Sequence, residues 1–253
     1  MAVNLADHVK YLEPGILEIS PWRCTVLYAD TGKRKTTTAV RLIQNKGILV
    51  SADNSWVVLK KDIHKDLLDK WMLVEYEGVS QLDNLKPEGY DHIILDTVTA
   101  MTDRYIDLLL KEGKWTSGKT GYREVLSTNH PELKDVVAPA GIDYHVLRNR
   151  FRPTITKLVR EYPCHIVLLM HAHFPSAMDK DKTIRPRMAP ATFQPIAEMA
   201  NIIGYITGGK GKSGFTVNMD ESSPIYVGKC QLEGFSRTMD LEDFIQVYKE
   251  TLV

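Results

Sequence analysis

Lys35 and Thr36 are the most informative pair of reactive side chains, because they follow a glycine-containing turn. The segment 29–36 reads ADTGKRKT, with the apolar run CTVLYA before it and the helix-like TTTAVRLIQ after it. A buried strand, such a turn and a helix N-terminus bind phosphate, since backbone N–H groups and a lysine face the anion. Lys35 would reach the β- and γ-phosphates of a nucleotide, and Thr36 would ligate Mg²⁺. The residues expected around the phosphates are Asp30, Thr31, Gly32, Lys33, Arg34, Lys35, Thr36 and Thr37.

Two positions of this loop depart from the phosphate-loop pattern GxxxxGK[ST]. Ala29 stands in place of the first glycine, and Arg34 stands in place of the second. Glycine lets the backbone approach phosphate without a Cβ and adopt unusual dihedral angles. Arg34 can adopt the right-handed conformation, where it would add charge; otherwise it would obstruct the pocket. The alternative interpretation is a strand-to-helix turn with a basic cluster that binds no nucleotide.

Two other strings contain parts of the same pattern. Residues 113–120, GKWTSGKT, match it in full, but they follow the helical run DRYIDLLLKE instead of a strand. This context predicts a chance match or a surface loop. Residues 209–213, GKGKS, lead into a strand and predict a hairpin turn.

Two carboxylates end predicted strands. Asp96 in HIILD is expected to hold Mg²⁺ beside the phosphate loop. Asp53, after GILVSA, is expected to orient or deprotonate the attacking water. The alternatives are a helix N-cap for Asp96 and an ordinary turn residue for Asp53.

His171 and His173 end the run HIVLLMHAH. A polar side chain at the carboxyl end of such a strand lies where α/β sheets bind ligands, so we expect His171 to sense the γ-phosphate. A half-buried structural histidine is the alternative. A metal site at these two histidines would need a third ligand, and none lies nearby in the sequence.

Four apolar runs predict the sheet that must position these side chains: 24–29, 47–52, 92–96 and 165–173. Their consecutive apolar residues are typical of parallel strands covered on both faces. Helix-like segments at 36–44, 99–113 and 144–162 alternate with them and predict a doubly wound α/β sheet. A fifth run at 201–207 and the segments 215–220 and 224–229 predict a small antiparallel extension, followed by a helix near 241–252. We expect one domain over 1–253, with an insertion or loop at 112–147 and a loop at 174–192.

The composition excludes several classes of protein. The chain has 253 residues, 32 basic against 32 acidic, and 43% hydrophobic residues, which excludes a polycation or a disordered chain. Three scattered cysteines, Cys24, Cys164 and Cys230, predict neither a disulfide framework nor a zinc site. No apolar run approaches the roughly 20 residues of a membrane span. We expect a cytoplasmic protein.

The segments VLYADTGKRKTTTA, ILVSADNS, YDHIILDTVTAM, IVLLMHAHF and IYVGKCQLEG occur in this order over about residues 20–250. Together they resemble the RecA-like P-loop ATPases, especially the compact phage-type ATPases of the single-strand annealing and recombination group. The resemblance implies a RecA-like core that uses ATP and Mg²⁺. It implies catalytic roles for Lys35, Asp53, Asp96 and His171, and metal ligation by Thr36 and Asp96.

The same resemblance implies a cation that reaches a neighbouring subunit's nucleotide. Hexameric RecA-like helicases carry a Lys-x-Arg pair near the C-terminus for this purpose. Here Lys229 is followed by Gln231 where the arginine would stand. Lys229 alone would act in the neighbour's site, or Arg237 would substitute.

In RecA-like proteins the loop after the sensor strand contacts single-stranded DNA. The corresponding segment contains the four candidate DNA-binding residues Lys180, Lys182, Arg185 and Arg187. Phe174 and Phe193 flank them, and cations with aromatic side chains suit non-specific binding of a single strand. A solvated loop is the alternative, because Asp179 and Asp181 dilute the charge.

The sequence thus predicts an ATP-binding, weakly ATP-hydrolysing protein that acts on single-stranded DNA in recombination or replication. It would assemble as a homo-oligomeric ring or filament, in the host cytoplasm if a phage encodes it. A catalytically weakened nucleotide-binding scaffold or sensor is the alternative, with Arg34 and Gln231 marking lost turnover. A nucleotide-kinase-like phosphotransferase, with the basic loop 180–187 as its lid, is a further alternative.

Overall fold

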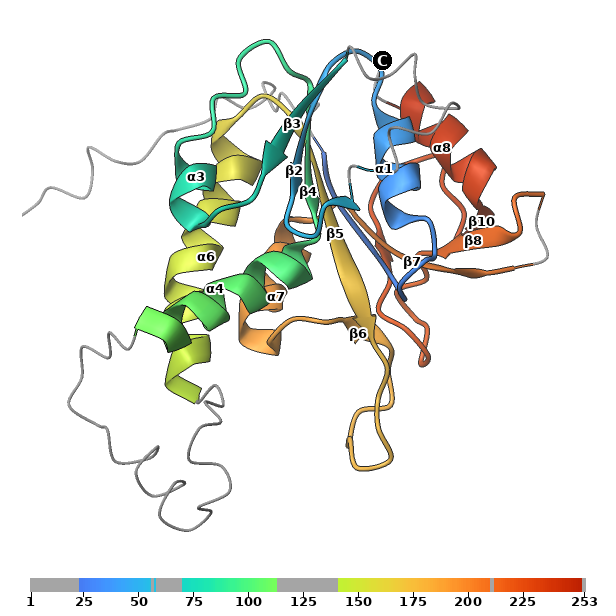
Figure 1. The fold of residues 1–253 in the computed structure, drawn as a ribbon. Coiled ribbons are helices and arrows are strands. Elements are labelled where there is room, and N and C mark those ends of the chain that lie inside the picture. The colour runs from blue at the N-terminus through green and yellow to red at the C-terminus, as the bar shows by residue number, and fades with distance from the viewer. Residues whose placement is uncertain (1–22, 56, 58–69, 113–140, 210–211, 252–253) are drawn as a thin grey trace, which may run out of the picture.

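A single large sheet forms the centre of the molecule, for which a computed structural model describes residues 23–55, 57, 70–112, 141–209 and 212–251. The strand order is β10-β8-β7-β1-β5-β4-β2-β3 (Figure 1). Six strands run parallel: β1 (Cys24–Ala29), β2 (Gly47–Ser51), β3 (Trp71–Glu75), β4 (His92–Asp96), β5 (His165–His173) and β7 (Ile202–Gly208). The antiparallel strands are β6 (Arg185–Pro186), β8 (Phe215–Asn218), β9 (Lys229–Cys230) and β10 (Thr238–Asp240). The predicted mostly parallel sheet with a C-terminal antiparallel extension is confirmed.

Helices cover both faces of the sheet, as Figure 1 shows. One face packs against α3 (Val79–Asp83), α4 (Val98–Glu112), α6 (Gly141–Glu161) and α7 (Pro190–Met199). The other packs against α1 (Lys35–Leu42) and α8 (Leu241–Glu250). Val26 and Tyr28 of β1 point into the first layer, and Leu27 and Ala29 into the second. Because both faces are buried, the strand is apolar at every one of these positions.

The carboxyl ends of the parallel strands meet at one edge of the sheet. The last residue of β1, Ala29, lies opposite His171 of β5, and Ser51 of β2 lies opposite Asp96 of β4. Burial on β5 ends at Met170, and the last three residues of the strand are only partly buried. Residues that follow these strands are therefore brought together at this edge.

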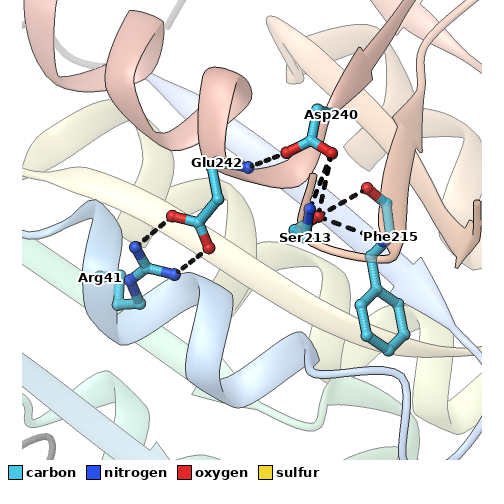
Figure 2. Close-up of polar contacts among 5 residues, drawn as sticks. All are labelled: Arg41, Ser213, Phe215, Asp240 and Glu242. Atoms are coloured by element: carbon cyan, nitrogen blue, oxygen red, sulfur yellow. Dashed lines mark hydrogen bonds and ion pairs between the residues drawn. The ribbon is translucent and has the colours of Figure 1, made fainter. Parts of the chain in front are cut away.

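A polar network fastens α8 to α1 and to the hairpin between β7 and β8 (Figure 2). Both guanidinium nitrogens of Arg41, in the last turn of α1, donate to the carboxylate of Glu242, at 2.7 and 2.5 Å. Asp240 caps α8 by accepting from the Glu242 N–H, and it also accepts from the Ser213 N–H and hydroxyl. The network holds the hairpin beside the helix that follows β1.

Several elements differ from the prediction. Strand β3 and helices α3 and α7 were not expected; β3 is an edge strand in which Trp71 is buried, Met72 and Val74 are partly buried, and Leu73 and Glu75 are exposed. The predicted loop 174–192 is wrong at its end, because β6 and the start of α7 lie within it, and Pro190 suits the first turn of a helix. The predicted insertion 112–147 is wrong for residues 141–147, which open α6. Residues 113–140, including the GKWTSGKT string, lie outside the described residues.

The predicted strand 224–229 is shorter than expected, because only Lys229 belongs to a strand, β9, and Tyr226 forms an isolated bridge with Ile184. None of the helices in the described ranges has the length and apolar character that crossing a bilayer requires.

Candidate nucleotide-binding site

The loop after β1 begins in an ordinary strand conformation. Ala29 is fully buried as the last residue of β1. The turn itself follows at Gly32, whose φ of 77° is in the left-handed region that favours glycine. A Cβ at Gly32 would meet nothing within 4 Å, so the space in front of the turn is open. The first departure from the phosphate-loop pattern, Ala29, therefore falls where glycine is not needed.

Arg34 adopts the left-handed conformation, with φ 60° and ψ 21°. The right-handed conformation that the sequence allowed for Arg34 is not the one adopted where the chain turns into α1. A non-glycine residue in this region costs roughly 1–2 kcal/mol. The guanidinium carbon lies 4.8 Å from the ring centre of Phe215 on β8, so the side chain is directed toward the β7–β8 hairpin.

Helix α1 presents free backbone amides at its start. The N-cap residue, Arg34, makes no side-chain cap, and the first helical bond runs from the Thr38 N–H to the Arg34 carbonyl at 2.8 Å. The amides of Lys35, Thr36 and Thr37 precede that bond and have no acceptor within the helix. A helix start with such amides attracts an anion.

Lys35 lies at the mouth of this loop and is only 7% exposed. Its Nζ donates to the carbonyl oxygens of Ala29, at 3.1 Å, and Asp30, at 3.0 Å. Burial lowers the pKa of Lys35, and the nearby carboxylates of Asp96, Asp30 and Asp53 partly oppose this. Phosphate oxygens would replace neutral carbonyls with charged acceptors, which form stronger hydrogen bonds with an ammonium group.

Asp96 is buried, with 1% exposure, and two hydroxyl groups hold one of its oxygens. Thr36 Oγ1 and Ser55 Oγ each donate to Asp96 Oδ2 at 2.5 Å. Among the described residues, nothing donates to Oδ1. Burial raises the pKa of Asp96 to about 6, although the hydroxyls of Ser55 and Thr36 oppose the rise.

The oxygens of Thr36 and Asp96 fit a bound Mg²⁺. This cation prefers hard oxygen ligands and is usually held by one or two carboxylates with substrate phosphates. A buried carboxylate with one oxygen unpaired gains a partner when a cation arrives. The residues predicted to hold the metal therefore lie together and have a suitable chemistry.

Asp53 and His171 lie at the same edge of the sheet. Asp53 is exposed, in the turn after β2, and its Oδ1 accepts from the Ser55 N–H at 3.2 Å. Burial and the charge of Lys35 lower the pKa of His171, while Asp53 opposes them. This lowered pKa favours the neutral imidazole, which can donate one hydrogen bond. The structure thus brings Lys35, Thr36, Asp53, Asp96 and His171 together.

Two hydroxyl residues of this site were not identified from the sequence. Ser55 holds Asp96, as described above, and Thr99 closes a ring of hydrogen bonds at the end of β5. The His171 N–H donates to Thr99 Oγ1 at 3.0 Å, Thr99 Oγ1 donates to the Arg187 carbonyl at 3.3 Å, and the Arg187 N–H donates to the His171 carbonyl at 2.8 Å. In the sequence, these two residues are marked only by their nearness to Asp53 and Asp96. Many other residues are equally near, so the sequence does not single them out.

Lys229 lies away from this loop in its own chain. Its Nζ donates to the carbonyls of Ala197, at 2.9 Å, and Glu198, at 3.2 Å, at the end of α7. Lys229 pairs with Ile203 of β7, and Ile203 in turn pairs with Val26 of β1. Val26 precedes the start of the 29–36 loop by three residues. A role of Lys229 in a neighbouring subunit's site stays a prediction.

The segment 174–184, here called the tongue, projects from the same end of the sheet between β5 and β6 (Figure 1). Lys182 donates to the carbonyls of Ser176 and Ala177 within it. Arg185 lies 3.6 Å from Asp181, and Arg187 lies 3.1 Å from Asp103. Lys180 is exposed.

The two predicted stacking residues differ in exposure. Phe174 is 48% exposed on the tongue, whereas Phe193 packs against the hydrophobic core. Of the pair, Phe174 is the one that a base could reach.

Comparison with known proteins places the chain in a family. The family model described as AAA domain matches residues 21–229, which include the loop, Asp53, Asp96 and His171. A crystal structure of the RadB recombinase is 13% identical, with 84% of each chain covered and a TM-score of 0.47. No curated protein matches the sequence. Because the family match spans well over half of its residues, the chain belongs to the AAA domain family of P-loop proteins.

Proposed function

We propose that this protein binds ATP with Mg²⁺ at the 30–37 loop, hydrolyses it, and acts on single-stranded DNA in recombination or replication as a homo-oligomer. One observation carries the nucleotide part. Thr36 Oγ1 lies 2.5 Å from the buried carboxylate of Asp96, directly after the loop that holds Lys35. A hydroxyl, a carboxylate and an ammonium group around free helix amides are the groups that nucleotide binding needs.

Each residue of the site has a distinct task. The amides at the start of α1 bind the phosphates, and Lys35 exchanges its two carbonyl acceptors for phosphate oxygens. Thr36 and Asp96 hold the metal, which when bound neutralises charge that develops on the phosphates. Asp53 accepts a proton from the attacking water, and the neutral imidazole of His171 donates a hydrogen bond to the γ-phosphate.

Calorimetric titration with ATP and Mg²⁺ tests the nucleotide site. We expect wild type to bind and Lys35→Ala to lose most of the affinity. Lys46→Ala is the matched control, because Lys46 is an exposed lysine just before the amino end of β2. Equal affinity of Lys35→Ala and wild type would refute the assigned site.

The tongue supports the proposed contact with DNA. Phe174 offers an exposed ring on which a base can stack, and Lys180 offers an exposed cation. The ion pairs of Arg185 and Arg187 lie at the surface, where such pairs contribute at most about 1 kcal/mol. Phosphates can therefore displace the aspartates from these arginines at little cost.

Fluorescence anisotropy of a labelled oligothymidylate tests this contact. Stacking on an aromatic side chain contributes about 1–3 kcal/mol per base, so Phe174→Ala should weaken binding roughly 5- to 150-fold. Leu73→Ala is the control, because Leu73 is comparably exposed, at 43%, on the distant edge strand β3. Unchanged affinity of Phe174→Ala would argue against the tongue as the DNA contact.

A further inference from the structure

Helix α6 carries a row of arginines on its solvent face. Arg148, Arg152 and Arg160 are spaced by multiples of four residues, so they lie on one side of the helix over about 18 Å. Together with Lys157 and the acidic Glu161, they line a shallow groove of about 480 Å³. Four cations against one anion make this a local positive surface on a chain whose formal net charge is zero.

Among the residues that the structure describes, the three arginines have no acidic partner. In the described part of the chain, no ion pair involves Arg148, Arg152 or Arg160. Arg150 on the same helix behaves differently, since it donates to Asp83 at 2.7 Å. Arg150 thus anchors α6 internally, whereas the row faces outward.

The chemistry of the groove favours a phosphate backbone over a protein or a membrane. Protein interfaces depend on aromatic and apolar anchors, and amphipathic helices bind membranes by inserting such side chains. Of the described residues that line this groove, none is aromatic or a large aliphatic residue. Guanidinium groups bind phosphate oxygens through two hydrogen bonds at once, so a row of them suits a polyanionic chain.

The row begins beside the base of the tongue. Leu147, next to Arg148, lines a second hollow of about 370 Å³ together with Arg185 and Arg187. Adjacent residues of α6 therefore border both hollows. Figure 1 shows the start of α6 and the tongue at the same end of the sheet.

We propose that the arginine row Arg148, Arg152 and Arg160 is a second binding surface for the sugar–phosphate backbone of a nucleic acid strand. It continues the path that begins at the tongue, and in this respect it rests on the proposed function. The tongue contacts bases through Phe174, and the row contacts phosphates without regard to sequence.

The salt dependence of oligothymidylate binding tests this surface. Each phosphate neutralised on a single strand contributes about 0.7 to the slope of log K against log salt, so Arg148→Gln with Arg152→Gln should lower the slope by about 1.4. Between 1 M and 0.1 M salt, the affinity of the wild type should therefore rise about 25-fold more than the affinity of the double variant. Arg160 is left unchanged, because a cation in the last turn stabilises the end of α6.

Matched variants decide the result. Arg150→Gln should keep the wild-type slope, and the double change to lysine should restore most of it, because the charge is retained. If the double glutamine variant keeps the wild-type slope, the arginine row does not bind phosphates, and the proposed contact of the tongue is unaffected. A weaker affinity with an unchanged slope would lead to the same conclusion. Binding of polyglutamate, but not of the oligonucleotide, through the same two arginines would also overturn it. If the wild type binds no oligonucleotide, the proposed action on DNA fails as well.

Discussion

Replacing Asp96 by asparagine should make the protein without ligands more stable while weakening the proposed binding of ATP with Mg²⁺. The carboxylate is 1% exposed, and Thr36 and Ser55 satisfy only one of its oxygens. Asparagine has the same shape and keeps an oxygen that can accept both hydroxyls. It lacks the charge that the fold must otherwise hold in a buried place.

The size of the effect follows from the pKa of Asp96. Burial raises it from 3.8 to about 6, and one pKa unit corresponds to about 1.4 kcal/mol, so the cost approaches 3 kcal/mol. Between these two values the folded protein retains a proton that the unfolded chain releases. The stability of the wild type therefore falls as the pH rises through this window, and the full cost is present above it.

Denaturation in urea, without nucleotide and with a chelator present, measures the difference at several pH values. Asp96→Asn should be about as stable as wild type near pH 4 and about 3 kcal/mol more stable at pH 8, while it loses affinity for ATP and Mg²⁺. Asp91→Asn is a control of opposite sign: burial raises the pKa of Asp91, but the imidazole of His92, 3.4 Å away, and the hydrogen bond from the Lys46 amide lower it to about 2. If Asp96→Asn shows no gain in stability at pH 8, or a gain that is independent of pH, then the buried charge does not destabilise the wild type as described.

Three further changes probe the surroundings of the site. Arg34→Gly should leave the affinity for ATP, measured by calorimetry, nearly unchanged; a large gain would show that the arginine blocks the loop. The same change should alter the free energy of unfolding by less than about 1 kcal/mol, because relief of the left-handed conformation is offset by the greater entropy of the unfolded chain. Glu242→Gln should cost at most about 1 kcal/mol at pH 7, since its pair with Arg41 is partly exposed. The hydrogen bonds from Arg41 lower the pKa of Glu242, so this contribution should disappear in denaturation curves as the pH falls well below 4.5. Thr99→Val should speed hydrogen exchange of the His171 amide, which loses its acceptor; unchanged exchange would contradict the ring of hydrogen bonds.

The sequence alone determined the parallel strands and the side chains at their carboxyl ends. Strands buried on both faces are apolar at consecutive positions, so β1, β4 and β5 stand out as runs, and the polar residues that end such runs must share one edge of the sheet. Asp96 and His171 were identified in this way. Strand β3 was missed although Trp71–Val74 are four consecutive apolar residues; its position at the sheet edge, which leaves Leu73 and Glu75 exposed, is set by the tertiary structure.

Only the tertiary structure decided how each side chain is used, because hydrogen bonds and exposure depend on segments distant in the sequence. The conformation of Arg34 depends on the turn into α1 and its direction on Phe215, 181 residues later. Lys229 is occupied by carbonyls of α7, and Arg150 differs from the row on α6 in that it donates to Asp83, 67 residues earlier. Local pattern places residues on elements, whereas packing between elements determines which charges are neutralised and which remain available for a ligand.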